Sequence, residues 1–177
     1  MRTLRTARLV LDEPREVDIV AVFEACQDAQ TQRWVPLPRP YTRASAEFFV
    51  RSYCPHGAAS GQYLVRALRE AEALPLVGVV EVRRDEAPGS ASIGCWLAPD
   101  ARGRGLMREA LAAVCDNALA PAPDGLGYTR LHWGHLIGND RSRSLAESLG
   151  FDFSASERQR VAIDDEAREL LIGVRTA

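Results

Sequence analysis

The stretch LAPDARGRGLMREAL, residues 97–111, places two glycines and three arginines between an apolar run that ends in proline and an amphipathic run of helical period. The first N–H groups of a helix have no partner within it, and the positive end of the helix dipole attracts anions. Glycine lets a phosphate approach the backbone closely, and guanidinium groups bind phosphate. The stretch therefore predicts a strand, a phosphate-binding loop and a helix, unless its glycines are plain turn residues and its arginines are solvated charges. The residues concerned are Arg102, Gly103, Arg104, Gly105 and Arg108.

Length and composition are those of an ordinary globular protein. Of the 177 residues, 46% are hydrophobic and 26% are charged, so we expect one domain over residues 1–177. The formal net charge of −2 gives no general attraction to nucleic acid or to an anionic membrane, and neither is expected as a partner. All 22 basic residues are arginine, which excludes a lysine nucleophile or Schiff base.

The cysteines and the chain start bear on the compartment. Cys26, Cys54, Cys95 and Cys115 show no CxxC spacing, and we expect them to be reduced thiols. The first residues lack the apolar segment of a signal peptide, and no run approaches ~18 apolar residues. The sequence therefore predicts a cytoplasmic protein.

Hydrophobic period and turn residues predict the order of the elements. A strand at 8–14 is followed by helices at 15–29 and 42–53, strands at 62–69, 74–84 and 91–98, a helix at 106–119, a strand at 128–137, a helix at 139–150, and a closing hairpin at 157–163 and 168–174 with its turn at 164–167. The three consecutive strands favour an antiparallel meander. The whole order predicts an α+β protein in which a mixed sheet has helices on both faces.

Helix boundaries are marked by specific residues. Thr42 and Asn139 are expected N-caps, and Gly150 is the expected C-terminal cap of its helix. Pro121 and Pro123 prevent the helix at 106–119 from continuing. Its apolar stripe is expected to be buried and consists of Leu106, Ala110, Leu111, Val114, Cys115 and Ala118.

Two motifs resemble one known family. DARGRGLMREAL resembles the acetyl-CoA pyrophosphate motif R/Q-x-x-G-x-G/A of the GNAT superfamily of N-acetyltransferases, with Arg102 at its first position and Gly105 at its central glycine. Met107 stands at the last position, where the family usually has glycine or alanine. GNDRSRSLAESLGF resembles the N-x-x-S…GF segment of the RimJ/RimL-like, ribosomal-protein alanine N-acetyltransferase branch. Its matching residues are Asn139, Ser142, Gly150 and Phe151.

The resemblance extends from Arg8 to the final hairpin and implies a fold, a co-substrate and a reaction. The fold is the three-layer α/β/α GNAT acyl-CoA N-acyltransferase fold, with a mixed, mostly antiparallel central sheet. Acetyl-CoA is the implied co-substrate, and the acetyl group passes directly to a primary amine of a protein N-terminus or a small molecule. We therefore expect acetyl-CoA and an amine acceptor as partners of a monomer or a homodimer.

The resemblance also implies where acetyl-CoA binds. Its pantetheine lies where the central strand splays from the strand at 128–137, against backbone groups of that central strand and Asn139. The diphosphate lies on the loop. The implied contact residues are Cys95, Trp96, Leu97, Arg102, Gly103, Arg104, Gly105, Leu106, Met107, Asn139 and Ser142.

Candidate catalytic residues have structural alternatives. Ser142 is expected to stabilise or protonate the CoA thiolate, as the matching serine does in the resembled branch, although it also fits the first turn of a helix. Relatives often carry glutamate where this chain has Ser92 and tyrosine where it has Cys95. Cys95 is interpreted as a strand residue and not a nucleophile. Glu81 is the expected general base, because a partly buried carboxylate accepts a proton more readily; its alternative is a solvent-facing position.

Aromatic and histidine residues are interpreted more simply. Trp34 is either part of the acceptor pocket or a core aromatic. His132 and His135 lie on opposite faces of one strand, which predicts structural or substrate-lining roles, and no third ligand supports a metal site. His56 is expected in a loop.

Two further functions compete with acetyl transfer. A non-catalytic acyl-CoA-binding or regulatory module would explain Ser92 and Cys95, because both replace groups that relatives use in catalysis. An arginine-rich nucleic-acid binder is disfavoured by the net charge.

Overall fold

The computed structural model describes residues 2–156, 158–163 and 166–177. The chain divides into two compact units, each built from separate segments. The first unit comprises residues 1–82 and 95–114, and the second comprises residues 83–94 and 115–177.

The first unit contains strands β1 (Leu4–Arg5), β2 (Val10–Asp12), β3 (Tyr63–Arg69) and most of β4 (Gly78–Arg84), which are neighbours in that order. Strand β2 pairs antiparallel with both β1 and β3. The helical segments of the first unit are η1 (Glu16–Asp18), α1 (Ile19–Gln27), α2 (Ala29–Trp34), α3 (Arg43–Phe48), η2 (Phe49–Tyr53), α4 (Cys54–Ser60) and η3 (Pro99–Ala101). It also holds the end of β5 (Ser90–Leu97) and the start of α5 (Leu106–Leu119).

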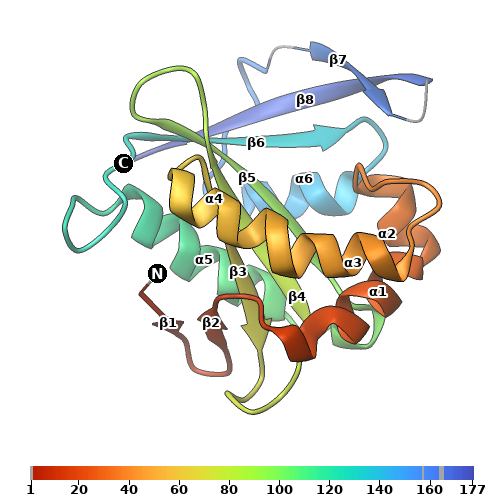
Figure 1. Cartoon of the computed structure of the whole chain (residues 1–177). Helices are drawn as coiled ribbons and strands as arrows, with labels where there is room; N and C mark the ends of the chain where they lie inside the picture. Colours follow the sequence, from red (N-terminus) through yellow and green to blue (C-terminus); the bar gives the residue numbers. More distant parts are fainter. Residues whose placement is uncertain (1, 157, 164–165) are drawn as a thin grey trace. The chain divides into compact units, whose positions relative to one another are not determined.

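The helices of the first unit pack against one face of its strands through a shared buried core. Helices α3 and α4 cross in front of the strands of this unit in Figure 1. Tyr63, Val65 and Ala67 alternate along β3, so they share one face, and they join a buried cluster with Val22 of α1 and Ala46 of α3. The predicted stripe of α5 is confirmed, since all six residues named above are buried.

The second unit contains the first part of β5, then β6 (Arg130–Leu136), α6 (Asp140–Glu147), β7 (Arg158–Ile163) and β8 (Glu166–Thr176). The strand order is β5-β6-β8-β7. Ser90–Ile93 of β5 pairs in parallel with residues 130–133 of β6, whereas β6–β8 and β7–β8 are antiparallel. The mixed, mostly antiparallel sheet with helices that the sequence predicts is confirmed.

The predicted caps are also confirmed. The Thr42 hydroxyl accepts a hydrogen bond from the Ser45 N–H at 3.2 Å, and Asn139 Oδ1 accepts one from the Ser142 N–H at 3.3 Å. Gly150, which follows α6, has a φ of +86°, a conformation that glycine adopts without strain.

Three local predictions were wrong or incomplete. The helical path from Thr42 continues beyond residue 53 through the π-helical turn η2 into α4, so His56 lies in a helix and not in a loop. Pro55 is accommodated because it stands in the first turn of α4, where no N–H is needed. Helix α2 and strand β1 were not predicted. Of the predicted turn at 164–167, residues 166 and 167 instead belong to strand β8, and residues 164 and 165 lie outside the described residues.

None of the helices in the described part of the chain is both long enough and apolar enough to cross a membrane.

Candidate functional site

The loop between β5 and α5 has a backbone that is open to an anion. Gly103 and Gly105 have φ values of +74° and +76°. The first helical hydrogen bond of α5 runs from the Glu109 N–H to the Gly105 carbonyl at 3.2 Å. The N–H groups of Leu106, Met107 and Arg108 precede that bond and have no partner within the helix.

Few atoms of the first unit lie close to the two glycines of this loop. A methyl group built on Gly103 would meet no atom within 4 Å, and one built on Gly105 would meet only the Arg8 guanidinium, at 3.6 Å. The loop can therefore be approached from outside at both glycines. Its free N–H groups and the positive end of α5 suit a phosphate.

Arg102 holds the loop from within. Its guanidinium donates to the Leu97 carbonyl at 3.1 Å, to the Asp28 carboxylate at 2.6 Å and to the Thr31 hydroxyl at 2.9 Å. The Arg102 hydrogen bond holds the pKa of Asp28 below its usual value. Asp28 also caps α2 by accepting from the Thr31 N–H at 2.8 Å. Arg102 thus ties the loop to the end of β5 and the start of α2, and its predicted diphosphate contact stays a prediction.

Arg104 is the more exposed cation of the loop. Its side chain is 46% exposed and forms a two-point ion pair with Glu70, of which the Nη1–Oε1 distance is 2.8 Å. The Arg104 hydrogen bond lowers the pKa of Glu70. This exposed guanidinium can turn toward a bound anion at small cost, because surface ion pairs are weak.

Arg8 supports the same loop, and the sequence did not reveal this. It donates to the Arg104 carbonyl at 2.9 Å and through its Nε to Glu109 of α5 at 2.6 Å. The pKa of Glu109 is lowered, first by a hydrogen bond from the Thr6 hydroxyl and then by Arg8. No local pattern could have shown this contact, since Arg8 and Glu109 are 101 residues apart.

The unusual methionine of the loop does not crowd its surface. Met107 is only 9% exposed and Leu106 is fully buried, so both side chains point into the protein and leave the loop N–H groups outside. In β5 the Trp96 side chain belongs to the buried cluster. Cys95 is half-buried, and the Leu97 carbonyl accepts from Arg102.

Glu81 and Trp34 occupy defined positions in the first unit. The Tyr53 hydroxyl donates to Glu81 Oε2 at 2.8 Å, and the Tyr53 ring stacks on Tyr63 with centroids 4.4 Å apart. Glu81 is half-buried. The Arg33 guanidinium lies over the Trp34 ring, 4.6 Å from its centroid.

Ser142 has a defined environment in the second unit. Its Oγ accepts a hydrogen bond from the Trp133 indole N–H at 3.0 Å, and its backbone N–H is taken by Asn139. The Trp133 ring packs against Phe151, with centroids 5.5 Å apart. Because the Ser142 oxygen is the acceptor, its own hydroxyl hydrogen can be donated elsewhere. The cap and the catalytic interpretation are therefore compatible.

A family model described as the acetyltransferase (GNAT) domain matches residues 8–152. The chain belongs to the GNAT acetyltransferase family. No curated protein matches this GNAT chain in sequence.

Several solved structures share the fold of this GNAT protein. The complex of the ribosomal alpha-N-protein acetyltransferase RimL with coenzyme A has a TM-score of 0.83 at 17% identity, over 99% of this chain and 98% of that chain. RimJ of Mycobacterium smegmatis, in complex with CoA-disulfide, gives 0.82 at 21%, over 99% and 86%. The microcin self-immunity acetyltransferase MccE, in complex with acetyl-CoA and AMP, gives 0.81 at 15%, over 97% and 94%.

One polar cluster of this GNAT chain was not found from sequence. In the second unit, His132 Nδ1 lies 2.7 Å from Asp85 Oδ2, and the Ser92 hydroxyl donates to the other oxygen of Asp85. Ser92 and His132 are register partners on the parallel strands β5 and β6. His135, in contrast, is buried against Phe153, with centroids 5.2 Å apart.

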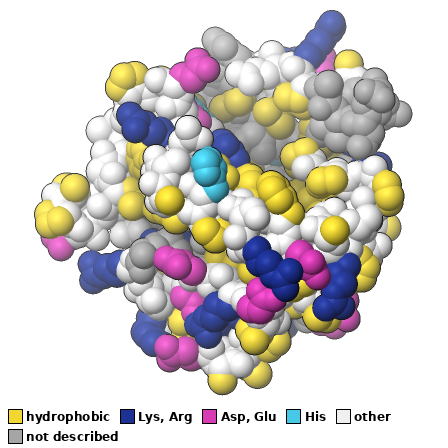
Figure 2. Space-filling view, in the orientation of Figure 1, with side chains coloured by type: hydrophobic (Ala, Val, Ile, Leu, Met, Phe, Trp, Pro, Cys, Tyr) yellow, Lys and Arg dark blue, Asp and Glu magenta, His cyan; other side chains and the backbone are white. Residues whose placement is uncertain are grey.

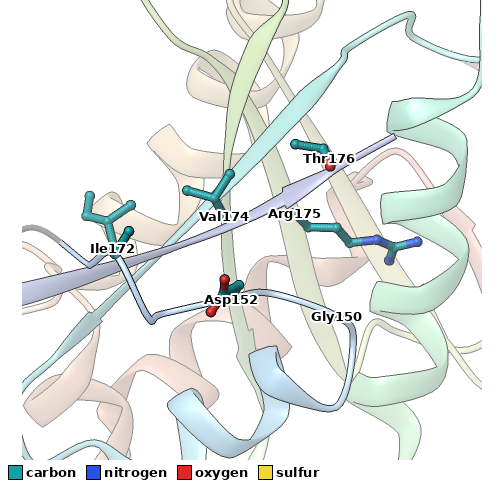
Figure 3. A pocket seen from close by; sticks show the side chains of 7 residues that line it. Gly150, Asp152, Ile172, Val174, Arg175 and Thr176 are labelled. Atoms are coloured by element: carbon teal, nitrogen blue, oxygen red, sulfur yellow. The ribbon is translucent and has the colours of Figure 1, made fainter.

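A groove of about 450 Å³ lies elsewhere in the second unit, along β8 (Figure 3). None of the predicted contact or catalytic residues lines it. Its polar groups are engaged, since Asp152 accepts from Ser154 and Arg175 pairs with Asp116. The lining residues are Gly150, Asp152, Ala155, Ile172, Val174, Arg175 and Thr176.

On the face that Figure 2 shows, arginine and acidic side chains are interspersed. Within the described residues, no group of three His, Cys, Asp or Glu side chains could hold a metal ion.

Proposed function

We propose that this GNAT protein is an acetyl-CoA-dependent N-acetyltransferase that moves the acetyl group to a primary amine. The observation that carries the proposal is the loop after β5. Two glycines at positive φ, a helix start that precedes the first helical hydrogen bond, and an exposed arginine occur together there in a chain that belongs to this family. The complexes of RimL with coenzyme A and of MccE with acetyl-CoA support acetyl-CoA as the co-substrate.

The loop is proposed to bind the diphosphate of acetyl-CoA. The N–H groups from Gly103 to Met107 and the Arg104 guanidinium make the contacts, while Arg102 positions the loop through Asp28 and Leu97. The remaining contacts, to pantetheine, are assigned to Asn139 and to backbone groups of residues 95–97.

Direct transfer needs a neutral amine, a polarised thioester and a proton for the departing thiolate. The amine nitrogen forms a bond to the acetyl carbon, and the bond from that carbon to sulfur breaks. We assign Ser142 as the donor to the sulfur, because the Trp133 N–H orients its oxygen and leaves its hydrogen available.

Glu81 and Trp34 are proposed to act on the amine acceptor, and Trp34 is proposed to line the acceptor pocket. We propose that the Glu81 carboxylate, which accepts a hydrogen bond from the Tyr53 hydroxyl, is the general base that takes a proton from the acceptor amine. The acceptor is a protein N-terminus or a small amine. The RimL and RimJ neighbours favour the RimJ/RimL-like branch and hence a protein N-terminus.

The domain organisation and compartment follow from the same proposal. The family match runs through segments of both units, which supports one acetyltransferase domain over residues 1–177. Four free thiols support the cytoplasm as its location. The proposal holds for a monomer or a homodimer.

Release of free CoA thiol from acetyl-CoA tests this proposal, measured with a panel of peptides bearing free N-termini and of small amines. We expect release that depends on one class of amine. Binding of acetyl-CoA by calorimetry without release in the presence of any amine would instead favour the non-catalytic acyl-CoA-binding module.

A further inference from the structure

Arg8 has a guanidinium nitrogen that remains open beside the loop between β5 and α5. Its Nε donates to Glu109 Oε2 at 2.6 Å, and its Nη1 donates to the Arg104 carbonyl at 2.9 Å. Among the residues that the structure describes, none accepts a hydrogen bond from the third nitrogen, Nη2. An arginine stays charged and carries two N–H donors on that nitrogen. Arg8 can therefore bind an anion without giving up either existing bond.

The open nitrogen lies at the face of the loop that Gly105 leaves uncovered. A methyl group built on Gly105 would lie 3.6 Å from Nη2 and, apart from its neighbours in the chain, within 4 Å of no other described atom. The Arg8 side chain is 50% exposed. The N–H groups of Leu106 and Met107, which have no partner within α5, follow Gly105 directly. An anion drawn to those N–H groups at Gly105 therefore comes within reach of Nη2.

The Arg8 guanidinium is held in place by a carboxylate that is itself anchored. Glu109 Oε1 accepts from the Arg8 backbone N–H at 2.8 Å and from the Thr6 hydroxyl at 2.6 Å. The Glu109 side chain is only 19% exposed. Because Glu109 is fixed through one oxygen, its other oxygen fixes the Arg8 Nε. A side chain that is already held loses little conformational freedom when it binds a ligand.

Arg104, the other guanidinium of the loop, is held differently. Its two terminal nitrogens are both bound to Glu70, so they must leave that carboxylate before they contact an anion. The pKa of Glu70 is lowered first by the Arg104 hydrogen bond and further by the charge of Arg8, which means that both guanidinium groups lie within electrostatic range of Glu70. Two cations beside one loop match the two negative charges of the diphosphate in acetyl-CoA.

We propose that Arg8 is a binding residue for the diphosphate of acetyl-CoA and that Glu109 is its positioning residue; this rests on the proposed function. Arg8 Nη2 donates a charge-assisted hydrogen bond to a diphosphate oxygen, while Nε and Nη1 keep their partners. Arg104 contacts the diphosphate only after it leaves Glu70. Arg8 is thus the cation that is in place before acetyl-CoA arrives.

Two substitutions that each remove one charge separate phosphate binding from support of the loop. Arg8→Gln removes the cation and its ion pair with Glu109, whereas Glu109→Gln removes the same ion pair and leaves the cation. We expect Arg8→Gln to weaken acetyl-CoA binding in calorimetry at least about tenfold, and Glu109→Gln to stay within about threefold of wild type. Arg5→Gln is the matched control and should bind within about twofold of wild type, because Arg5 is an exposed arginine of the same unit that pairs with Glu72 at 3.2 Å.

A shortened co-substrate tests which part of acetyl-CoA Arg8 contacts. Acetyl-pantetheine carries the thioester but no diphosphate. We expect Arg8→Gln to lower kcat/KM for acetyl-CoA at least about tenfold, and to leave kcat/KM for acetyl-pantetheine at the wild-type value. An equal loss with both co-substrates would overturn the proposal, since it would trace the effect to the shape of the site and not to the diphosphate.

The possible failures are distinguishable. If the wild type binds acetyl-CoA and Arg8→Gln binds it equally well, or if Glu109→Gln loses as much affinity as Arg8→Gln, Arg8 is rejected as a binding residue while the proposed function stands. If the wild type binds acetyl-CoA and transfers acetyl to no amine, the proposed transfer is rejected, and the calorimetric comparison still decides the role of Arg8. A wild type that does not bind acetyl-CoA would reject both.

Discussion

Replacing Gly105 by alanine separates the conformational cost of the loop from its contact with acetyl-CoA. Gly105 has a φ of +76°, and an added methyl would meet only the Arg8 guanidinium, at 3.6 Å. The substitution therefore costs stability through the backbone and not through a clash. Gly61, which ends α4 with a φ of +66° and no atom within 4 Å of a built methyl, is a matched control in the same unit.

The two alanine variants should be destabilised equally and bind differently. A non-glycine residue in the left-handed region costs about 1–2 kcal/mol, and the lower entropy of the unfolded chain offsets about 0.4–1 kcal/mol of this. We expect a net loss near 1 kcal/mol in each, or about 2–4 °C in Tm for a chain of this length. Only Gly105→Ala places a methyl over the loop N–H groups, and it should weaken acetyl-CoA binding at least about tenfold, or about 1.4 kcal/mol.

Thermal unfolding and calorimetric titration with acetyl-CoA measure both quantities on the same samples. Wild-type affinity in Gly105→Ala would refute the assignment of the loop as the diphosphate site. An equal loss of affinity in Gly61→Ala would also refute the reasoning, since it would trace the effect to general destabilisation.

Four further outcomes are expected. Gly105→Val should weaken acetyl-CoA binding more than alanine does, because a β-branched residue tolerates positive φ poorly, and calorimetry showing equal affinities would contradict this. Ser142→Ala should lower kcat more than acetyl-CoA affinity in steady-state and binding assays, and an unchanged kcat would remove Ser142 from the mechanism. Arg104→Ala should weaken acetyl-CoA binding, and the loss of affinity should depend on salt concentration. Arg102→Ala should chiefly lower the free energy of unfolding measured by urea titration, by about 1–2 kcal/mol. The reverse pattern would mean that Arg102 binds acetyl-CoA and that Arg104 supports the fold. Thiol titration of the native protein at pH 8 should modify Cys95 and leave three other cysteines unmodified, because burial raises the pKa of their thiols. Modification of those three cysteines in the native protein would contradict their burial. Those cysteines are Cys26 (about 11), Cys54 (about 12) and Cys115 (about 11).

The sequence predicted best where a local pattern is enough. The helix α5 begins and ends at the predicted residues, 106 and 119, because six apolar residues recur at helical spacing and prolines follow. The Asn139 cap was predictable for the same reason, since capping depends on residues three positions apart.

Local patterns failed where the path of the chain depends on tertiary packing. His56 was expected in a loop, yet α4 forms there because Pro55 stands in its first turn and Gly57 packs against Tyr63. Helix α2 is separate from α1 because Asp28 is extended and caps it, and that conformation is favoured by its contact with Arg102.

The candidate site was predictable as a loop but not as a set of side-chain contacts. Arg102 reaches Asp28 across 74 positions, and His132 reaches Asp85 across 47. Such pairs depend on strand register and on how helices pack, neither of which is set by neighbouring residues. The burial of the Met107 side chain was likewise not predicted from the sequence.

The central claim is that this GNAT protein transfers acetyl from acetyl-CoA to an amine nitrogen. Mass spectrometry of the acceptor, after incubation with acetyl-CoA whose acetyl group is isotopically labelled, tests this claim most directly. We predict that the label appears on the acceptor as an amide, and that it is absent when Gly105→Val replaces the wild type. An acceptor panel that stays unlabelled while the protein binds acetyl-CoA would contradict the account.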